Sequence, residues 1–79
     1  MNPIRRAGVV AFIDWVSRKY PEIGALRDVS EAEFMELAVA YEGAKGLNIN
    51  RNHNLYGKWR STYYVLSHCE SQEEALQRL

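Results

Sequence analysis

The sequence is poor in the residues that build covalent cross-links and metal centres. Its 79 residues include a single cysteine, Cys69, so an internal disulfide is excluded. A lone cysteine is typical of proteins from reducing compartments, and we expect a cytoplasmic protein. No CxxC, HxxxH or HExxH spacing occurs. We therefore expect neither a structural metal site nor a cofactor.

Long apolar runs are absent as well. The longest, residues 8–13, is far shorter than the roughly 20 residues that cross a bilayer, so no membrane contact is expected. Charged residues follow it directly and no small-residue cleavage site comes after it, which argues against a secretory signal peptide. Internal repeats and low-complexity linkers are missing too. Residues 1–79 are therefore expected to form one helical domain.

Residue pairs that carry out catalysis are also missing. Cys69 has His68 beside it, but neighbouring side chains point apart on a helix or a strand, so the thiol lacks a base. Gly43 and Gly46 are not followed by the lysine and hydroxyl residue of a phosphate-binding loop. The carboxylates show no apolar setting of the kind that raises a catalytic pKa. The sequence therefore predicts a protein that is not an enzyme.

Charge is distributed in blocks, although the formal net charge is zero. Residues 22–42 carry six acids and one base, whereas residues 43–69 carry four bases and no acid. The second block also contains Trp59 and three tyrosines, which makes it the candidate contact region. Two poles on the folded surface, or packed blocks that neutralise each other, are both consistent with this pattern.

The first predicted helix covers residues 3–20. Pro3 suits its first position with Asn2 as the cap, and the residue before Pro21 avoids helical geometry. Trp15 lies beside the apolar face of this helix. Either it widens the core contact or it is an exposed anchor for a partner, because tryptophan is highly buried on average and enriched at binding hot spots. The apolar face itself consists of Val9, Phe12, Ile13, Val16 and Tyr20.

A second helix is predicted to follow Ser30. Ser30 and Glu33 have the spacing of a capping box, and either Gly43 or Gly46 suits the left-handed stop. The helix dipole favours acids at the N-terminal end, which accounts for most of the acidic face. After the stop, four asparagines in residues 47–54 favour a structured polar turn. The apolar stripe consists of Phe34, Leu37, Ala38 and Tyr41.

Residues 55–69 allow two interpretations. As a strand, residues 61–66 have high β propensity, but alternation would place polar and apolar side chains on both faces. Periodicity favours a helix, followed by a short one that a second capping box opens at Ser71. The predicted fold is all-α, a small bundle of three to four helices; the alternative is a small α+β domain with a strand near residues 59–67. If residues 55–69 are helical, the buried face of that helix would consist of Leu55, Trp59, Thr62, Tyr63, Leu66 and Cys69.

A ridge of basic and aromatic side chains is the strongest candidate contact surface. If residues 55–69 are helical, Tyr56, Arg60 and Tyr64 recur every four residues outside the buried face. Such a ridge stacks on bases or aromatic side chains, while its basic neighbours meet phosphates or acids. A solvated face whose tyrosines cover the core edge is the structural alternative. The candidate partner-binding residues are Arg51, His53, Tyr56, Lys58, Arg60, Tyr64 and Trp15.

We expect a non-catalytic binding protein that acts as an inhibitor or regulator by occupying a surface of a larger protein complex. Stand-alone domains of this size are often inhibitors encoded by phages or mobile elements, for example against a host defence complex. In that case Glu31, Glu33, Glu36 and Glu42 offer a second surface, as phosphate mimics at a basic channel. The alternative is a small nucleic-acid-binding regulator that uses the basic aromatic stretch 51–64, although few positive charges are present. A tyrosine-rich face is also compatible with a symmetric homodimer.

Overall fold

Helices account for every regular element of the computed structural model, which describes residues 3–79. The all-α prediction is confirmed, whereas the alternative strand near residues 59–67 is wrong, because those residues are helical. The predicted cap at Asn2 lies outside the described residues. In chain order the elements are α1 (Pro3–Lys19), the short 3-10 helix η1 (Leu26–Asp28), α2 (Glu31–Ala44), α3 (Asn54–His68) and α4 (Gln72–Arg78).

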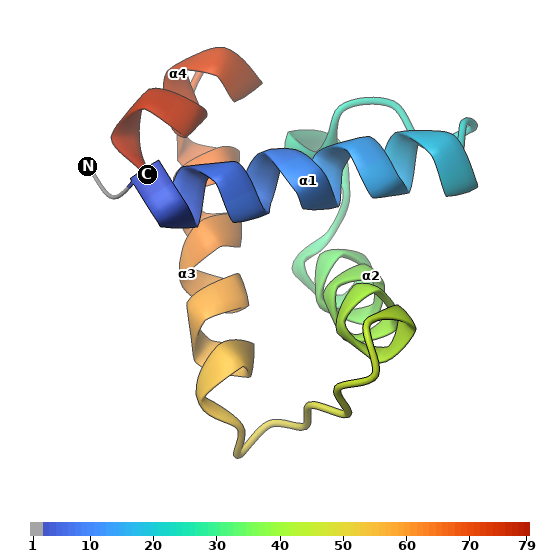
Figure 1. Ribbon diagram of the computed structural model, residues 1–79. Helices are drawn as coiled ribbons and strands as arrows, with labels where there is room; N and C mark the ends of the chain where they lie inside the picture. The colour runs from blue at the N-terminus through green and yellow to red at the C-terminus, as the bar shows by residue number, and fades with distance from the viewer. Residues whose placement is uncertain (1–2) are drawn as a thin grey trace.

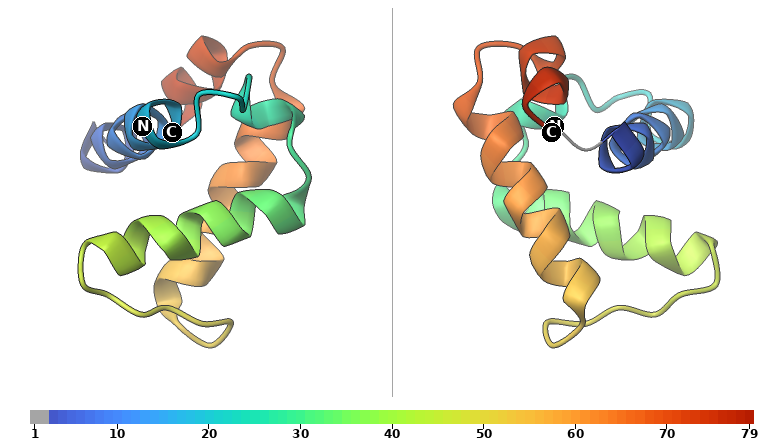
Figure 2. Two further views of the ribbon diagram at one scale, coloured as in Figure 1. Left: turned by 90° about the vertical axis from the view of Figure 1, so that its right-hand side faces the viewer. Right: turned by 60° about the vertical axis from the view of Figure 1, so that its left-hand side comes forward.

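The third helix is the centre of the arrangement. It packs against α2, α4 and η1, while α1 packs against α2 and α4. Figure 1 shows α1 lying across α3, with α4 on the far side of α1 from α2. Figure 2 shows that α2 runs across α3 rather than parallel to it. The two helices therefore diverge toward their outer ends, and one side of their crossing is not covered by α1 or α4.

An aromatic cluster forms the core where α1, α2 and α3 meet. The ring of Phe12, which is 0% exposed, lies 5.5 Å from Phe34, 5.3 Å from Tyr41 and 4.5 Å from Trp59, measured between ring centroids. Tilted and edge-on rings at these distances add to the stabilisation that their burial gives. The apolar faces predicted from periodicity are thus the faces that pack inward: Val9, Phe12, Val16, Phe34, Leu37, Ala38, Tyr41, Trp59, Thr62, Leu66 and Cys69 are buried.

Local signals fix both ends of α2. The hydroxyl of Ser30 accepts a hydrogen bond from the backbone N–H of Glu33 at 3.1 Å, as the capping spacing predicts. At the other end, the N–H of Leu47 donates to the carbonyl of Glu42. The N–H of Gly46 donates to the carbonyl of Gly43. Gly46 has a φ of +89°. This is a Schellman motif, and Gly46 rather than Gly43 is the left-handed stop.

Alanine at these two glycines is expected to change stability in opposite directions. A Cβ at either position meets no atom within 4 Å, so steric clashes with neighbouring residues do not contribute to the change in stability. Gly46→Ala forces alanine into the left-handed region and should lower the free energy of unfolding by about 1 kcal/mol. Gly43→Ala places alanine within helix α2 and should raise it by about 0.5–1 kcal/mol. Urea titration measures both, and equal signs for the two variants would contradict the assignment of the stop.

The polar loop before α3 is a structured turn. The side-chain oxygen of Asn50 accepts from the N–H of Asn52 at 2.9 Å, and Ile49 is buried beneath the turn. His53 then caps α3, because its Nδ1 accepts from the N–H of Leu55 at 3.1 Å. These bonds satisfy groups that the turn would otherwise leave unpaired.

Capping bonds and one long-range bond also place the C-terminal part of the chain. Ser71 caps α4 by accepting from the N–H of Glu74, and the Glu74 carboxylate accepts from the N–H of Glu70. The hydroxyl of Tyr63 donates to the carbonyl of Val29 at 2.9 Å, which ties α3 to the segment before α2. Within residues 3–79, no helix is both long and apolar enough to cross a bilayer.

Candidate functional site

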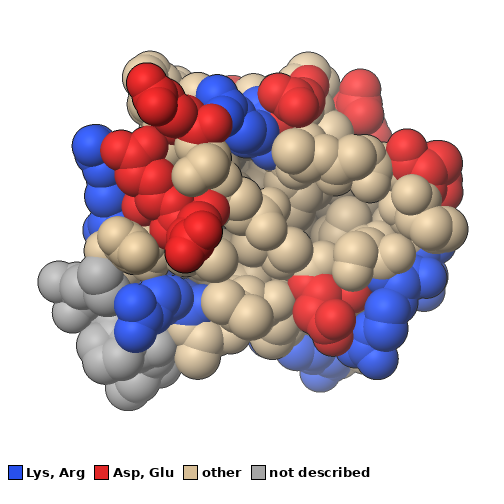
Figure 3. Space-filling view, turned by 90° about the horizontal axis from the view of Figure 1, so that it is seen from above, with Lys and Arg blue, Asp and Glu red and all other residues tan. Residues whose placement is uncertain are grey.

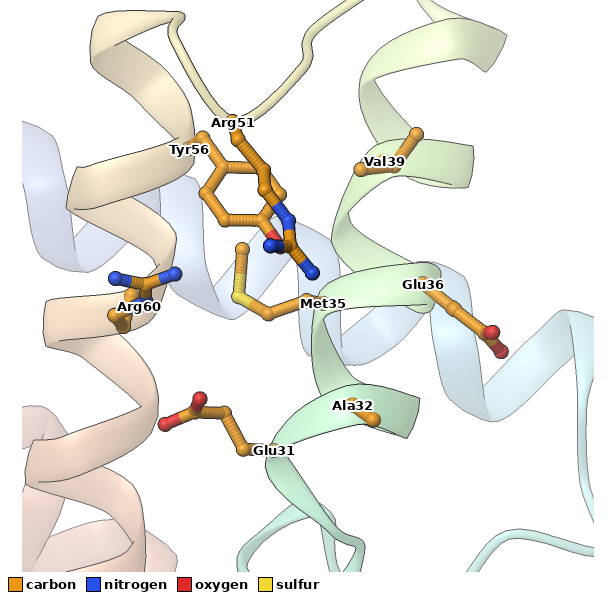
Figure 4. Close-up of a pocket in the computed structure, with 8 residues that line it drawn as sticks. All are labelled: Glu31, Ala32, Met35, Glu36, Val39, Arg51, Tyr56 and Arg60. Atoms are coloured by element: carbon orange, nitrogen blue, oxygen red, sulfur yellow. The ribbon is translucent and has the colours of Figure 1, made fainter.

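A groove lies between α2 and α3, on the side of their crossing that α1 and α4 leave open. Its volume is about 490 Å³, and Figure 4 shows the residues that line it. Helix α2 supplies one wall, and α3 with the turn before it supplies the other. We call it the α2–α3 groove; its lining residues are Glu31, Ala32, Met35, Glu36, Val39, Arg51, Tyr56 and Arg60.

The α3 wall is basic and aromatic. Tyr56 and Arg60 lie one turn apart on α3, and the guanidinium carbon of Arg60 is 5.5 Å from the centroid of the Tyr56 ring. This cation–π contact orients the guanidinium and leaves its N–H donors available. Figure 4 shows the Arg51 side chain reaching from the turn over the groove beside Tyr56. Two guanidinium groups therefore flank one aromatic ring.

The α2 wall is acidic above an apolar floor. Glu31, Met35 and Val39 follow one another at four-residue spacing, and Ala32 and Glu36 form a second, parallel row. Met35 is 4% exposed and forms the floor. In Figure 4 the carboxylate of Glu31 extends toward Arg60, whereas that of Glu36 extends to the outer side of α2. The wall thus directs the Glu31 carboxylate toward the α3 side and the Glu36 carboxylate away from the groove.

The charged side chains of the groove make no ion pair among the residues that the structure describes. Ion pairs in that part of the chain join Arg18 to Asp14, Lys45 to Glu42 and Arg78 to Glu74, and all of these lie outside the groove. The acidic block of residues 22–42 and the basic block of residues 43–69 meet along the groove without neutralising each other through contact. Both charges therefore remain available to a ligand.

Three of the predicted contact residues, Arg51, Tyr56 and Arg60, are brought together in the groove. Tyr64 continues the same row by one turn and is 51% exposed. Its ring lies 6.0 Å from the ring of His68 and does not line the groove. The ridge predicted from four-residue spacing exists on the outer face of α3, with Tyr56 half-buried and Tyr64 exposed.

The other predicted contact residues lie elsewhere. His53 caps α3 with its ring nitrogen, as described above. Lys58 lines a second pocket, of about 400 Å³, on the opposite side of α3. Trp15 is half-buried on α1, with its ring 5.4 Å from that of Tyr41 and the ammonium of Lys19 5.3 Å above it. The structure thus places Trp15 at the edge of the core, the first of the two interpretations offered by the sequence.

Glu42 corrects one expectation, because it is not an exposed phosphate mimic. The residue is 3% exposed, and its carboxylate accepts from the indole N–H of Trp59 at 3.0 Å and pairs with the ammonium of Lys45 at 3.0 Å. A buried carboxylate needs such partners. Periodicity carries the signal for this burial, since Glu42 follows Phe34 and Ala38 at four-residue spacing on the buried face of α2.

Sequence reasoning also missed the α2 wall of the groove. The sequence attributes most of the acidic face to the helix dipole and offers Glu31 and Glu36 only as phosphate mimics, not as neighbours of the basic ridge, and it does not assign Met35 to the buried face. The available signal is the four-residue row that Met35 makes with Glu31 and Val39, which runs beside the main apolar stripe. That row becomes a wall of the groove only because α3 crosses α2 at this point.

The side chains considered for catalysis are separated by burial. Cys69 is buried and has no disulfide partner, whereas His68 is exposed with its Nδ1 2.7 Å from the carbonyl of Tyr64. Among the described residues, no group of three or more histidine, cysteine or acidic side chains is placed to hold a metal ion.

The face seen from above, over α1 and α4, carries scattered acids and bases around a mainly uncharged centre (Figure 3).

No protein-family model, curated protein or solved structure matches the chain. The geometry and the charges of the α2–α3 groove are therefore the observations on which a function rests.

Proposed function

We propose that this protein is a small non-catalytic binding protein, which inhibits or regulates a larger protein complex by occupying one of its surfaces through the α2–α3 groove. One observation carries the proposal. Arg51 and Arg60 flank Tyr56 on one wall, Glu31 and Glu36 lie on the other, and none of the four charged groups is in an ion pair with another residue of the described chain.

The composition of the groove supports a macromolecular partner. Tyrosine and arginine are the residues most enriched, with tryptophan, at the energetic centres of protein interfaces. The guanidinium of Arg60 is held over the Tyr56 ring, so little side-chain freedom is lost when a ligand binds.

The charge balance of the groove favours a protein partner over nucleic acid. Its lining contains two arginines and two glutamates, so its formal charge is zero. A phosphate backbone in this groove would meet the Glu31 carboxylate beside Arg60. Affinity for nucleic acid depends on the number of phosphates that basic side chains neutralise. A protein surface carries both signs of charge and matches both walls.

The setting of the proposed function follows from the sequence. With one cysteine, we place the protein in a reducing cytoplasm. A single domain of 79 residues is a common form for inhibitors encoded by phages or mobile elements, and a host defence complex is one concrete target.

Charge reversal on the α3 wall is expected to abolish partner capture. The tagged protein and its Arg51→Glu/Arg60→Glu variant are used as baits in a lysate of the native host cell, with mass spectrometry as the readout. Recovery of the partner should fall at least tenfold for the variant, because two guanidinium contacts become repulsive. Arg18→Glu/Arg78→Glu changes the net charge by the same amount away from the groove, and this control should retain the partner.

Two results would contradict the proposal. Equal loss of the partner in both variants would show that net charge, and not the groove, determines capture. Capture that disappears after nuclease treatment would favour the nucleic-acid-binding alternative instead. Sedimentation velocity tests the homodimer: a dimer that the groove variant disperses would assign the groove to a second copy of this chain.

A further inference from the structure

A second cavity lies on the opposite side of α3 from the α2–α3 groove, where the first turns of α1 cross α3 (Figure 1). Its volume is about 400 Å³, and it shares no lining residue with the groove. Residues at the C-terminal end of α2 line a third side. We call it the α1–α3 pocket; its lining residues are Arg5, Gly8, Val9, Tyr41, Glu42, Lys45, Leu55, Lys58, Trp59 and Thr62.

Cationic side chains from three different parts of the chain converge on this pocket. Arg5 belongs to α1, Lys45 follows the end of α2, and Lys58 belongs to α3. The guanidinium of Arg5 donates to the hydroxyl of Thr62 at 3.3 Å and to the carbonyl of Lys58 at 3.4 Å, and these contacts hold it against α3. Within residues 3–79, the ammonium of the exposed Lys58 makes no ion pair. Cations gathered at one cavity favour an anion between them.

The carboxylate of Glu42 does not neutralise this charge. Glu42 is 3% exposed; one of its oxygens accepts from the indole N–H of Trp59 at 3.0 Å, and the other pairs with the ammonium of Lys45 at 3.0 Å. The described lining contains three cations and one carboxylate, which leaves a formal charge of +2. Because Glu42 already binds Lys45, this excess belongs to Arg5 and Lys58. A ligand with two negative charges balances it.

Apolar side chains and a glycine form much of the remaining lining. Val9 and Trp59 are buried, and Leu55 is half-buried. Gly8 lies in the interior of α1, where glycine is less favourable than alanine. A Cβ at this position would meet no atom within 4 Å, so the glycine leaves open space at the wall of the pocket. This space accommodates an apolar body beside the charged group.

From this geometry we infer that the α1–α3 pocket binds a small organic dianion, a doubly charged phosphate or dicarboxylate group on an apolar body. The charged group lies between Arg5 and Lys58, because guanidinium and ammonium groups are the usual partners of such anions. The apolar body packs against Trp59 in the space that Gly8 leaves open. The inference goes beyond the proposed function and does not depend on it, because the pocket and the α2–α3 groove are separate.

Other kinds of ligand match the pocket less well. A neutral apolar ligand would cover the cations without balancing their charge. A cationic ligand would place like charge against them. The phosphodiester backbone of a nucleic acid carries one negative charge at each phosphate, which is half of the charge that the pocket balances.

NMR titration of the nitrogen-labelled protein with small anions tests the inference. At about pH 8 phenyl phosphate is a dianion, since the second pKa of a phosphate ester is about 6. Phenyl phosphate and phenylmalonate should each bind about fivefold more tightly than benzoate, which has one charge, and than inorganic phosphate, which has no apolar body. The indole N–H signal of Trp59 should shift and that of Trp15, which does not line the pocket, should not. The tighter of the two dianions identifies the charged group.

Two pairs of variants separate the pocket from general effects of charge and packing. Lys58→Gln should weaken binding of phenyl phosphate about threefold, whereas Lys19→Gln removes the same charge at the other end of α1 and should have no effect. Gly8→Leu fills the open space and should weaken binding at least about tenfold, whereas Gly57→Leu adds the same side chain to α3 outside the pocket. Leucine favours a helix more than glycine does, so both leucine variants should fold.

The inference is overturned if the dianions bind no more tightly than benzoate and inorganic phosphate, or if the Trp59 indole signal stays unchanged. It is also overturned if Lys58→Gln and Gly8→Leu bind phenyl phosphate as well as their controls do, since binding would then occur elsewhere on the surface. None of these results concerns partner capture through the α2–α3 groove, so failure of this inference and failure of the proposed function are distinguishable.

Discussion

Replacing Trp59 with phenylalanine should lower the free energy of unfolding by about 3 kcal/mol. The indole N–H of Trp59 donates to the carboxylate of Glu42, and both residues are buried between α2 and α3. Phenylalanine removes this donor and leaves the carboxylate with Lys45, whose own side chain is half exposed. A charged group that loses a buried hydrogen bond costs more than the neutral bond is worth. Chemical denaturation followed by circular dichroism measures the change.

A double-mutant cycle separates the buried hydrogen bond from the lost ring volume. Glu42→Gln alone keeps a side-chain oxygen that accepts from Trp59, and should be mildly destabilising. In the Trp59→Phe background, the same substitution replaces a buried carboxylate that has lost one of its two partners, and it should raise stability. This reversal of sign is the diagnostic result. Additive effects of the two substitutions would show that the Glu42–Trp59 bond contributes nothing beyond packing.

The same bond is expected to influence the proposed binding site. It joins the C-terminal part of α2 to α3, on the opposite side of α3 from the α2–α3 groove. The crossing of α2 and α3 sets the separation of the groove walls, so a contact that fixes this crossing also fixes the positions of Arg60 and Glu31. Pre-organisation of this kind lowers the entropic cost of binding.

The second large effect is expected for Phe12→Ala, which should lower the free energy of unfolding by about 4 kcal/mol. Phe12 is 0% exposed and its ring contacts those of Phe34, Tyr41 and Trp59. Removing the ring leaves a cavity where three helices meet, and a domain of this size has only about 5–15 kcal/mol of total stability. Thermal unfolding should therefore shift strongly to lower temperature.

Val10→Ala is the matched control for this core substitution. Val10 lies two residues away on the same helix and is 47% exposed, so its truncation should change stability by less than about 0.5 kcal/mol. Phe12→Leu retains much of the buried volume and should fall between the two. If Phe12→Ala and Val10→Ala had similar effects, the packing of α1 against α2 and α3 described above would be wrong.

Much of the fold can be predicted from local signals in the sequence. Ser30 caps α2 and Gly46 ends it, because these positions depend on the chemistry of a few neighbouring residues. The buried faces of the helices could be predicted equally well, since the 3.6-residue period alone determines which side chains share a face. For α3, that period outweighed the β propensity of residues 61–66.

The roles of individual polar residues were harder to predict, because they depend on which groups of the folded chain each side chain contacts. Glutamate is usually exposed, but Glu42 is buried, because Trp59 supplies an N–H donor across the interface of α2 and α3. His53 looked like a contact residue, yet its ring nitrogen caps α3. The four-residue spacing of Glu42 with Ala38 is the one sequence signal for its burial.

By itself, the sequence indicated that this chain forms helices, where two of them begin, and which faces turn inward, because each of these depends on residues within one or two turns. Only the tertiary structure decided that Arg51, Tyr56 and Arg60 meet the acidic wall of Glu31 and Glu36 in one groove. The angle at which α2 crosses α3 brings these walls together. Contacts between distant residues set that angle, and local periodicity carries no information about it.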